Sequence, residues 1–315
     1  MSVARRLQGE RGQASPEWIG VTLLLAALFS AALAGLGPLP LAVSVARAIG
    51  AKLVCAVSLT QVCRSHPELI AAYGAELSEA VRRHAPALLY ERGMRALPVD
   101  FRSCRSATCS DGAAEGMVWR SGSGEPVTAF VHVIDCRAGQ PPLAGTPGTT
   151  CSSSSAGRLY LQYWLYYPDS ATLRGAPVVG AKGFHRDDWE SYQVRVDAGE
   201  GAEARASSHH GYNYKQGSSN WGSDAGIAPL KTSSEAAGLR DPGGWGPETG
   251  TLFVSGGSHA GNAKANLLRY PRLTPADRLR LIPLEPLAGR ERAGFAVSPP
   301  WRKRVWLDPE AEGTD

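Results

Sequence analysis

One short stretch of the sequence gathers side chains that could hold a cation. Within KGFHRDDWESYQVRV, residues 182–196, one histidine and three carboxylates fall in six residues, and a strand-like alternation follows. Asp188 and Glu190 are two residues apart, so on a strand they project from the same face. A turn at the start of that strand would bring His185 toward the same point. Carboxylate oxygens with one imidazole favour Mg²⁺, Ca²⁺ or Mn²⁺ over zinc, so the stretch predicts a divalent-cation site.

The alternative interpretation is a solvated start of a strand, in which the acids pair with nearby arginines. Asp187 would point to the face opposite Asp188, where Arg186 could neutralise it. The segments SSHHGY and GGSHA, residues 207–212 and 256–260, add histidines at the ends of predicted strands, where β scaffolds usually carry their sites. We therefore expect a shared pocket, and its candidate residues are His210, Ser258, His259 and Trp189.

The elements that must position these residues are short strands. From residue 117 onward, β-branched and aromatic runs are separated by Gly, Pro, Ser and Asp, which is the pattern of strands joined by turns. The 36 glycines and 22 prolines also favour a loop-rich β architecture over a helical bundle. We predict a mainly β fold, an antiparallel β-sandwich. Upstream, apolar residues at helical spacing between positions 65 and 86 predict a helix that lies against this domain.

The amino-terminal region predicts a membrane anchor. Residues 18–37 carry no charge and are long enough to cross a bilayer as a helix. Arg5, Arg6 and Arg11 precede this run, and that bias places the amino terminus in the cytoplasm. We expect a single-pass protein of the cell membrane whose carboxy-terminal domain is extracellular.

The sequence RGQASPEWIG, just before the apolar run, resembles the leader of type IV pilin-like proteins, particularly the Flp and Tad-type branch. The resemblance implies cleavage after Gly12, which makes Glu17 the fifth residue of the mature chain. It also implies a pilus or secretion machinery as a partner. Trp18 stands where the Flp branch usually has tyrosine. An ordinary signal anchor is the alternative interpretation.

Together these patterns predict four segments. They are a cytoplasmic leader at 1–12, a pilin-like transmembrane helix at 13–37, a helical neck at 38–92 and a β-sandwich domain at 93–310.

Six cysteines lie beyond the apolar run, at Cys55, Cys63, Cys104, Cys109, Cys136 and Cys151. An even number in an exported region suggests disulfides, although six cysteines allow fifteen pairings. Pairing each cysteine with its neighbour, 55–63, 104–109 and 136–151, is the simplest arrangement. A zinc site is disfavoured because the sequence has no C-x-x-C pair.

The HRDDWE motif resembles the G-H-R-H-D-W-E heptapeptide of the necrosis- and ethylene-inducing-like proteins, a family of β-sandwich cytolysins. It is also similar to the H-x-x-D-W-E signature of fungal vacuolar protein sorting-associated relatives. LQYWLYYPD before the motif, then SSHHG and GGSHA after it, agree in order, and the likeness covers about residues 82–262. In this chain, Phe184 replaces the first glycine of the heptapeptide and Asp187 its second histidine. The cytolysin resemblance implies a divalent cation held by Asp169, His185, Asp188 and Glu190.

These observations predict recognition of a surface glycan or lipid head group, with cytolysin-like membrane damage as an extension of that role. A metal-dependent hydrolase of a phosphoester or glycolipid, with His210 or His259 carrying the proton, is an alternative. A minor pilin-like structural subunit is another. Whether the chain is an enzyme stays open, since no standard catalytic motif is present. The net charge of +4 comes from scattered basic residues, so we expect no nucleic-acid partner.

Overall fold

The computed structural model describes residues 66–137, 151, 154–171, 184–197, 199, 201–208, 211–214, 244–265, 269–285 and 294–311. The chain divides into two compact units, Met1–Pro67 and Glu68–Asp315, and nearly all the described residues belong to the second. The predicted transmembrane helix, Gly12, Glu17, Cys55, Cys63 and His210 lie outside the described residues. Within the described ranges, no helix is long and apolar enough to cross a membrane.

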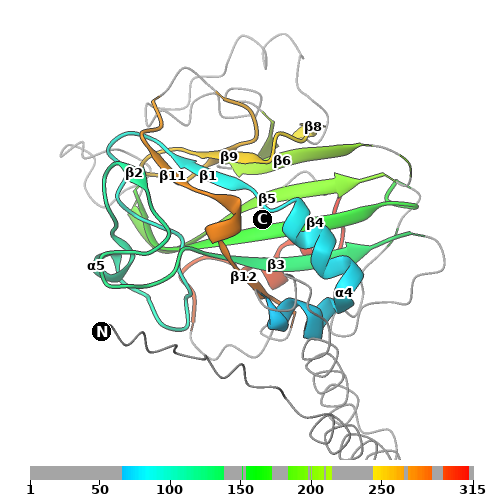
Figure 1. The fold of residues 1–315 in the computed structure, drawn as a ribbon, viewed down its shortest axis with the longest axis horizontal. Helices are drawn as coiled ribbons and strands as arrows, with labels where there is room; N and C mark the ends of the chain where they lie inside the picture. Colours follow the sequence, from blue (N-terminus) through cyan, green and yellow to red (C-terminus); the bar gives the residue numbers. More distant parts are fainter. Residues whose placement is uncertain are drawn as a thin grey trace, which may run out of the picture. The chain divides into compact units, whose positions relative to one another are not determined.

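Two β-sheets form the framework of this unit (Figure 1). The five-stranded sheet has the order β10 (Gly261–Asn262), β9 (Thr251–Val254), β1 (Ala87–Tyr90), β11 (Arg272–Thr274) and β2 (Gly116–Met117). The second sheet has the order β12 (Arg280–Pro283), β3 (Thr128–Asp135), β4 (Leu159–Ala171), β5 (Phe184–Val196), β6 (Ala202–Ser208) and β7 (Gly211–Asn213), and β8 (Gly246–Pro247) pairs with β6. The fold is therefore mainly β, as the sequence predicts.

The sheets are mixed rather than wholly antiparallel. The strand pairs β1–β9, β11–β2 and β12–β3 are parallel, whereas the long pairs around β4 and β5 are antiparallel. Parallel partners need long connections, and each of these pairs joins segments that are far apart in the sequence. Local alternation in the sequence cannot reveal such pairs. The predicted antiparallel sandwich is therefore confirmed only in part, because two sheets are present but three strand pairs are parallel.

One hydrophobic core holds the two sheets together. It contains Leu88 and Leu252 from the five-stranded sheet, and Val131, Leu161 and Val194 from the second sheet. Because side chains from both sheets share this cluster, the sheets pack face to face. Each fully buried aliphatic side chain stabilises the fold by about 1.5–3 kcal/mol relative to exposure.

β4 and β5 are the longest strands and lie at the centre of their sheet (Figure 1). They pair antiparallel from Leu159 opposite Val196 to Ala171 opposite Phe184. β4 is buried on both faces, since Leu165 faces the core between the sheets and Trp164 belongs to a second cluster on the outer face. A strand covered on both faces reads as a continuous apolar run, which accounts for the sequence LQYWLYY.

Residues near the carboxy terminus cover the second cluster. Val305 and Trp306, in the short 3₁₀ helix η4 (Arg304–Trp306), pack with Phe130, Trp164 and Trp189 on the outer face of the sheet. The other short helices in the described ranges are α5 (Ala107–Ser110), η2 (Ala276–Arg278) and η3 (Pro300–Arg302).

Helix α4 (Pro67–Arg83) lies within the predicted neck and packs its apolar stripe on the sandwich. Gly74 interrupts it with φ 80°, a left-handed conformation that glycine adopts at little cost. The Tyr163 hydroxyl donates to the Val81 carbonyl oxygen at 2.6 Å, which ties β4 to the end of the helix. The predicted 38–92 neck ends in a strand, because β1 already belongs to the five-stranded sheet.

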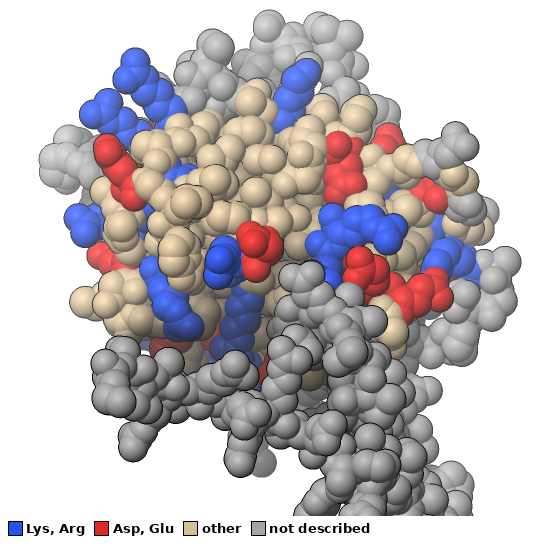
Figure 2. Space-filling model, viewed as in Figure 1, with Lys and Arg blue, Asp and Glu red and all other residues tan. Residues whose placement is uncertain are grey.

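Two disulfides lie in the described part of the chain, Cys104–Cys109 and Cys136–Cys151. They confirm two of the three neighbour pairings. On the face drawn in Figure 2, basic and acidic side chains are interspersed, so its described part presents no large area of one charge.

Candidate functional site

The two central carboxylates of the motif face the interior between the sheets. Asp188 lies opposite Tyr167 on β4 and Glu190 lies opposite Leu165, and both of these β4 residues belong to the inner core. Asp188 and Glu190 are only 7% and 9% exposed. Their position on one face follows from the two-residue alternation of a strand. They are therefore not part of a solvated start of a strand.

His259 reaches Asp188 from the opposite sheet. It lies in the turn between β9 and β10, and its Nδ1 is 2.9 Å from Oδ2 of Asp188. The imidazole stacks on the Tyr167 ring, with centroids 4.0 Å apart and an interplanar angle of 16°. Its backbone has φ 58°, which is uncommon for a residue with a side chain. Such conformations persist where the surrounding structure enforces them, and they cluster at functional sites.

The turn that carries His259 is held at its base. The Gly256 N–H donates to Oε2 of Glu91 at 2.6 Å, and Glu91 follows directly after β1. The Ala260 carbonyl oxygen accepts a hydrogen bond from the Ser255 N–H at 2.9 Å. Ser258, a predicted pocket residue, is buried in the same turn. The turn is thus fixed to the framework on which β1 and β9 lie.

Glu190 and Tyr167 extend the polar group deeper between the sheets. The Ser207 hydroxyl of β6 donates to Oε2 of Glu190. The Tyr167 hydroxyl is fully buried and has no hydrogen-bond partner in the described part of the chain. Burial raises the pKa of this hydroxyl, and the negative charges of Asp188 and Glu190 raise it further. A buried polar atom without a partner marks a place where water, an ion or a ligand would supply the missing interaction.

Asp169 lies half-buried near the end of β4, at the edge of this group. Burial is the main cause that raises the pKa of its carboxyl above the ordinary value. The charge of Asp188 also raises that pKa, whereas His259 and His185 lower it. Asp169 therefore lies within electrostatic reach of Asp188, His259 and His185. His185 itself turns back to its own strand, with Nδ1 2.9 Å from the Asp187 carbonyl oxygen.

Asp187 is neutralised by a different arginine from the one predicted. Arg186 is exposed, whereas the Asp187 carboxylate accepts hydrogen bonds from Arg105 at 2.7 Å and from the Tyr166 hydroxyl at 2.6 Å. Its other oxygen accepts from the Ala296 N–H at 2.8 Å. Burial alone would raise the pKa of Asp187, but these hydrogen bonds and the guanidinium charge lower it overall.

Trp189 does not join the predicted pocket with His259. It is 5% exposed and lies on the outer face of the sheet, opposite to the face that carries Asp188. Its ring packs against Phe101, Tyr166 and Phe295 with centroid separations of 5.5, 5.1 and 5.7 Å. Since neighbours on a strand alternate between faces, a tryptophan directly after Asp188 belongs to the outer aromatic cluster.

Three contributors to the site were absent from the sequence prediction. Tyr167 stands two residues before Asp169, a spacing that places both on one face of a strand. Ser207 begins the SSHHG segment, in which the two histidines are the more evident candidates for a site. Glu91 carried no signal, because its role depends on a contact 165 residues away.

The donor types at this site suit a hard divalent cation, since carboxylate oxygens dominate and the Tyr167 hydroxyl lacks a partner. In the described part of the chain, however, no group of three or more His, Cys, Asp or Glu residues is close enough to hold a metal ion. Asp188 and Glu190 instead accept hydrogen bonds from His259 and Ser207.

No family model and no curated protein matches the sequence. Solved structures of similar backbone include "NLPPya in complex with mannosamine", with a TM-score of 0.32 and 16% identity over 70% of this chain and 81% of that one. "NLPPya in complex with glucosamine" has a TM-score of 0.31 at the same identity and coverage. "Crystal structure of non-toxic HaNLP3 protein" has a TM-score of 0.32 and 15% identity, over 70% of this chain and 83% of that one. Backbone agreement at this level supports neither a shared ligand nor a shared activity.

Proposed function

We propose that the chain recognises a polyhydroxylated ligand, a surface glycan or a lipid head group, in a divalent-cation-dependent manner. The single observation that supports this is the contact between Asp188 and His259, which joins the two sheets at one end of the sandwich. Asp169 and Glu190 add two further carboxylates to the same end.

Each residue has a role that follows from its position. Asp188 and Glu190 would supply buried carboxylate oxygens, and Asp169 would supply one from the edge of the site. His185 would have to rotate away from the Asp187 carbonyl oxygen to contribute its imidazole. When bound, a divalent cation would supply a positive charge that attracts hydroxyl or phosphate oxygens of a ligand. His259 would orient Asp188, in the way that outer hydrogen bonds orient metal ligands.

A metal-dependent hydrolase of a phosphoester or glycolipid is the second candidate. Asp188 contacts Nδ1 of His259, so Nε2 is the atom through which the imidazole could accept a proton from water. A carboxylate that fixes an imidazole in this way is a recurring arrangement in general-base catalysis. His210, the other proton carrier predicted from the sequence, lies outside the described residues.

The membrane anchor, the extracellular location and the link to a pilus or secretion machinery remain proposals carried by residues 1–37. A minor pilin-like structural role would make the Asp188–His259 contact unnecessary and would depend on Glu17. Glu17→Ala tests it through surface assembly of the full-length chain.

Calorimetric titration of the full-length chain with Ca²⁺, Mg²⁺ and Mn²⁺ tests the main proposal. We expect saturable binding of at least one ion, weakened at least about tenfold by Asp188→Asn and by Glu190→Gln. Glu203→Gln is the matched control, since Glu203 is an acid of the same sheet that pairs with Arg195 at 2.6 Å. Negligible heat for the wild type with all three ions would remove the cation from the proposal.

Two further measurements separate recognition from catalysis. Binding to a glycan array that disappears with EDTA and with Asp188→Asn would support recognition. Turnover of bis-p-nitrophenyl phosphate that is lost in His259→Asn would favour the hydrolase instead.

A further inference from the structure

We propose that Arg105 and Asp187 form a latch on the outer face of the sheet that positions the acid–histidine site on the inner face. The latch is defined as the ion pair between these two side chains. It rests on the proposed function, because the site that it positions is the one described above. The hydrogen bonds of the Arg105 and Asp187 side chains go to each other, Tyr166, Gly294 and Ala296, so both would be positioning residues.

The backbone at Asp187 needs such support. Asp187 has φ 57°, and in the described part of the chain only one other residue besides glycine, His259, has a positive φ. L-residues adopt this left-handed region at a cost in free energy, even though aspartate tolerates it better than most. Both strained residues adjoin Asp188: Asp187 precedes it in the sequence, and His259 is hydrogen-bonded to it. A conformation of this kind persists only when its surroundings hold it.

The Asp187 carboxylate is held by three donors from three separate segments. Arg105 and the Tyr166 hydroxyl donate to Oδ1, and the Ala296 N–H donates to Oδ2. The side chain is only 5% exposed. Removing the guanidinium would leave a buried carboxylate with its charge uncompensated, which is costly.

Arg105 is itself fixed from both sides. It lies inside the short loop closed by the Cys104–Cys109 disulfide, whose cysteines have a sequence separation of 5, and Cys104 is buried in the outer aromatic cluster. Its guanidinium lies 4.6 Å from the centroid of the Phe295 ring and donates to the Gly294 carbonyl oxygen at 3.0 Å. A guanidinium with stacking, hydrogen bonds and a covalently closed loop behind it has few alternative positions.

Fixing Asp187 also affects the inner face of the sheet, because Asp187, Asp188 and Glu190 all lie on β5. Because neighbouring residues alternate, fixing Asp187 toward the outer face turns Asp188 and Glu190 inward. The carbonyl oxygen of Asp187 also accepts the contact from Nδ1 of His185. The latch therefore sets the backbone to which His185 and Asp188 are attached.

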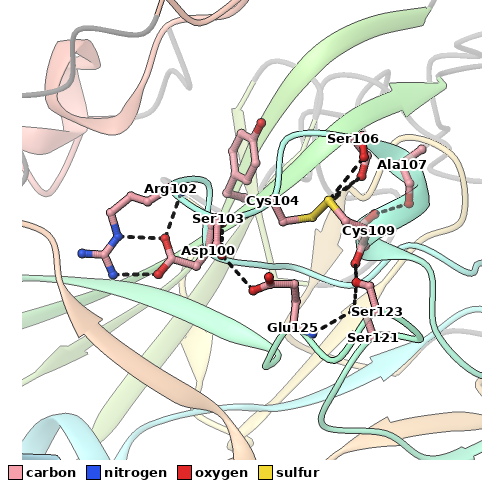
Figure 3. The surroundings of a disulfide bond; sticks show 12 residues. Asp100, Arg102, Ser103, Cys104, Ser106, Ala107, Cys109, Ser121, Ser123 and Glu125 are labelled. Carbon is pink, nitrogen blue, oxygen red and sulfur yellow. Dashed lines mark hydrogen bonds and ion pairs between the residues drawn. A yellow bond between two sulfur atoms is a disulfide. The ribbon is translucent and has the colours of Figure 1, made fainter.

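A purely structural ion pair is the competing explanation, and the chain offers a matched control for it. Arg102, three residues earlier, binds the Asp100 carboxylate with two guanidinium nitrogens at 2.9 and 2.6 Å (Figure 3). The Asp100 and Asp187 side chains are both 5% exposed. Asp100 precedes the disulfide loop and does not lie on β5. Arg102→Gln therefore removes a similar ion pair without touching the strand that carries the site.

The experiment compares Arg105→Gln, Arg102→Gln and Asp187→Asn in the full-length chain. The first readout is the ¹³Cε1 and ¹Hε1 chemical shifts of the His259 imidazole, assigned with His259→Asn and recorded in EDTA. The second is Mn²⁺ affinity by calorimetry, at a temperature where all variants remain folded by circular dichroism. We expect Arg105→Gln and Asp187→Asn to shift the His259 signals and to weaken Mn²⁺ binding by about tenfold. Arg102→Gln should change neither readout.

The two readouts separate failure of the latch from failure of the proposed function. If the wild type binds no Mn²⁺ but Arg105→Gln still moves the His259 signals, the latch stands and the cation proposal falls. If His259 signals in Arg105→Gln match the wild type, the latch is overturned whatever the metal result. Equal effects of Arg102→Gln and Arg105→Gln on both readouts would also overturn it, since the effect would then be general. Because Asn tolerates positive φ, Asp187→Asn preserves the backbone preference and guards against misfolding.

Discussion

The contact between Asp188 and His259 should be a coupled pair whose strength can be measured. The side chains are 10% and 5% exposed, so water screens their interaction poorly. A hydrogen bond to a charged group contributes about 1.5–3 kcal/mol, and the stacking of His259 on Tyr167 adds about 0.5–1.5 kcal/mol. His259→Ala removes both, so it should lower the free energy of unfolding by about 2–4.5 kcal/mol.

A double-mutant cycle isolates the hydrogen bond from the stack. Asp188→Ala and His259→Ala, alone and combined, should show a coupling energy of about 1.5–3 kcal/mol. Urea unfolding followed by tryptophan fluorescence, with EDTA present so that no cation contributes, gives the four stabilities. Additivity within about 0.5 kcal/mol would refute the reasoning, because it would mean that the two side chains do not interact in solution.

His259→Gly tests the backbone part of the same argument. At φ 58°, alanine bears a steric cost that glycine does not. We expect the glycine variant to be more stable than the alanine variant by about 1 kcal/mol. The reverse order would show that the turn relaxes to an ordinary conformation when the imidazole is absent.

Two further predictions concern the framework. Burial alone would raise the pKa of Asp100, but hydrogen bonds and charge from Arg102 lower it overall. Its carboxylate therefore contributes stability above its unfolded-state pKa of about 4. That contribution is lost as the pH falls below about 4 and through the depressed folded-state value. Asp100→Asn should make the melting temperature depend less on pH below about 4. An unchanged pH dependence of the melting temperature would contradict this prediction. Cys136→Ser with Cys151→Ser opens a loop with a sequence separation of 15 and should cost about 3 kcal/mol. Thermal unfolding measures this cost, and a melting temperature equal to that of the wild type would show that the loop is constrained by other contacts.

The sequence alone predicted the features that depend on neighbours along the chain. Alternation placed Asp188 and Glu190 on one face of a strand, and the β-branched and aromatic runs indicated the strands. Two neighbouring cysteine pairs, with separations of 5 and 15 residues, form the disulfides that proximity favours. These features follow from the two-residue repeat of a strand and from the low cost of closing short loops.

Only the tertiary structure decided which distant groups meet. His259 reaches Asp188 across 71 positions, and Arg105 reaches Asp187 across 82. The His259 turn follows β9, which pairs in parallel with β1, and it contacts Asp188 on β5. No local pattern encodes that pairing. Arg186 was the nearest cation in the sequence, yet it points into solvent, while Arg105 is held by a disulfide loop and an aromatic ring. Residue types and spacing thus determine which chemistry is available, and the packing of the two sheets determines which side chains come into contact to perform it.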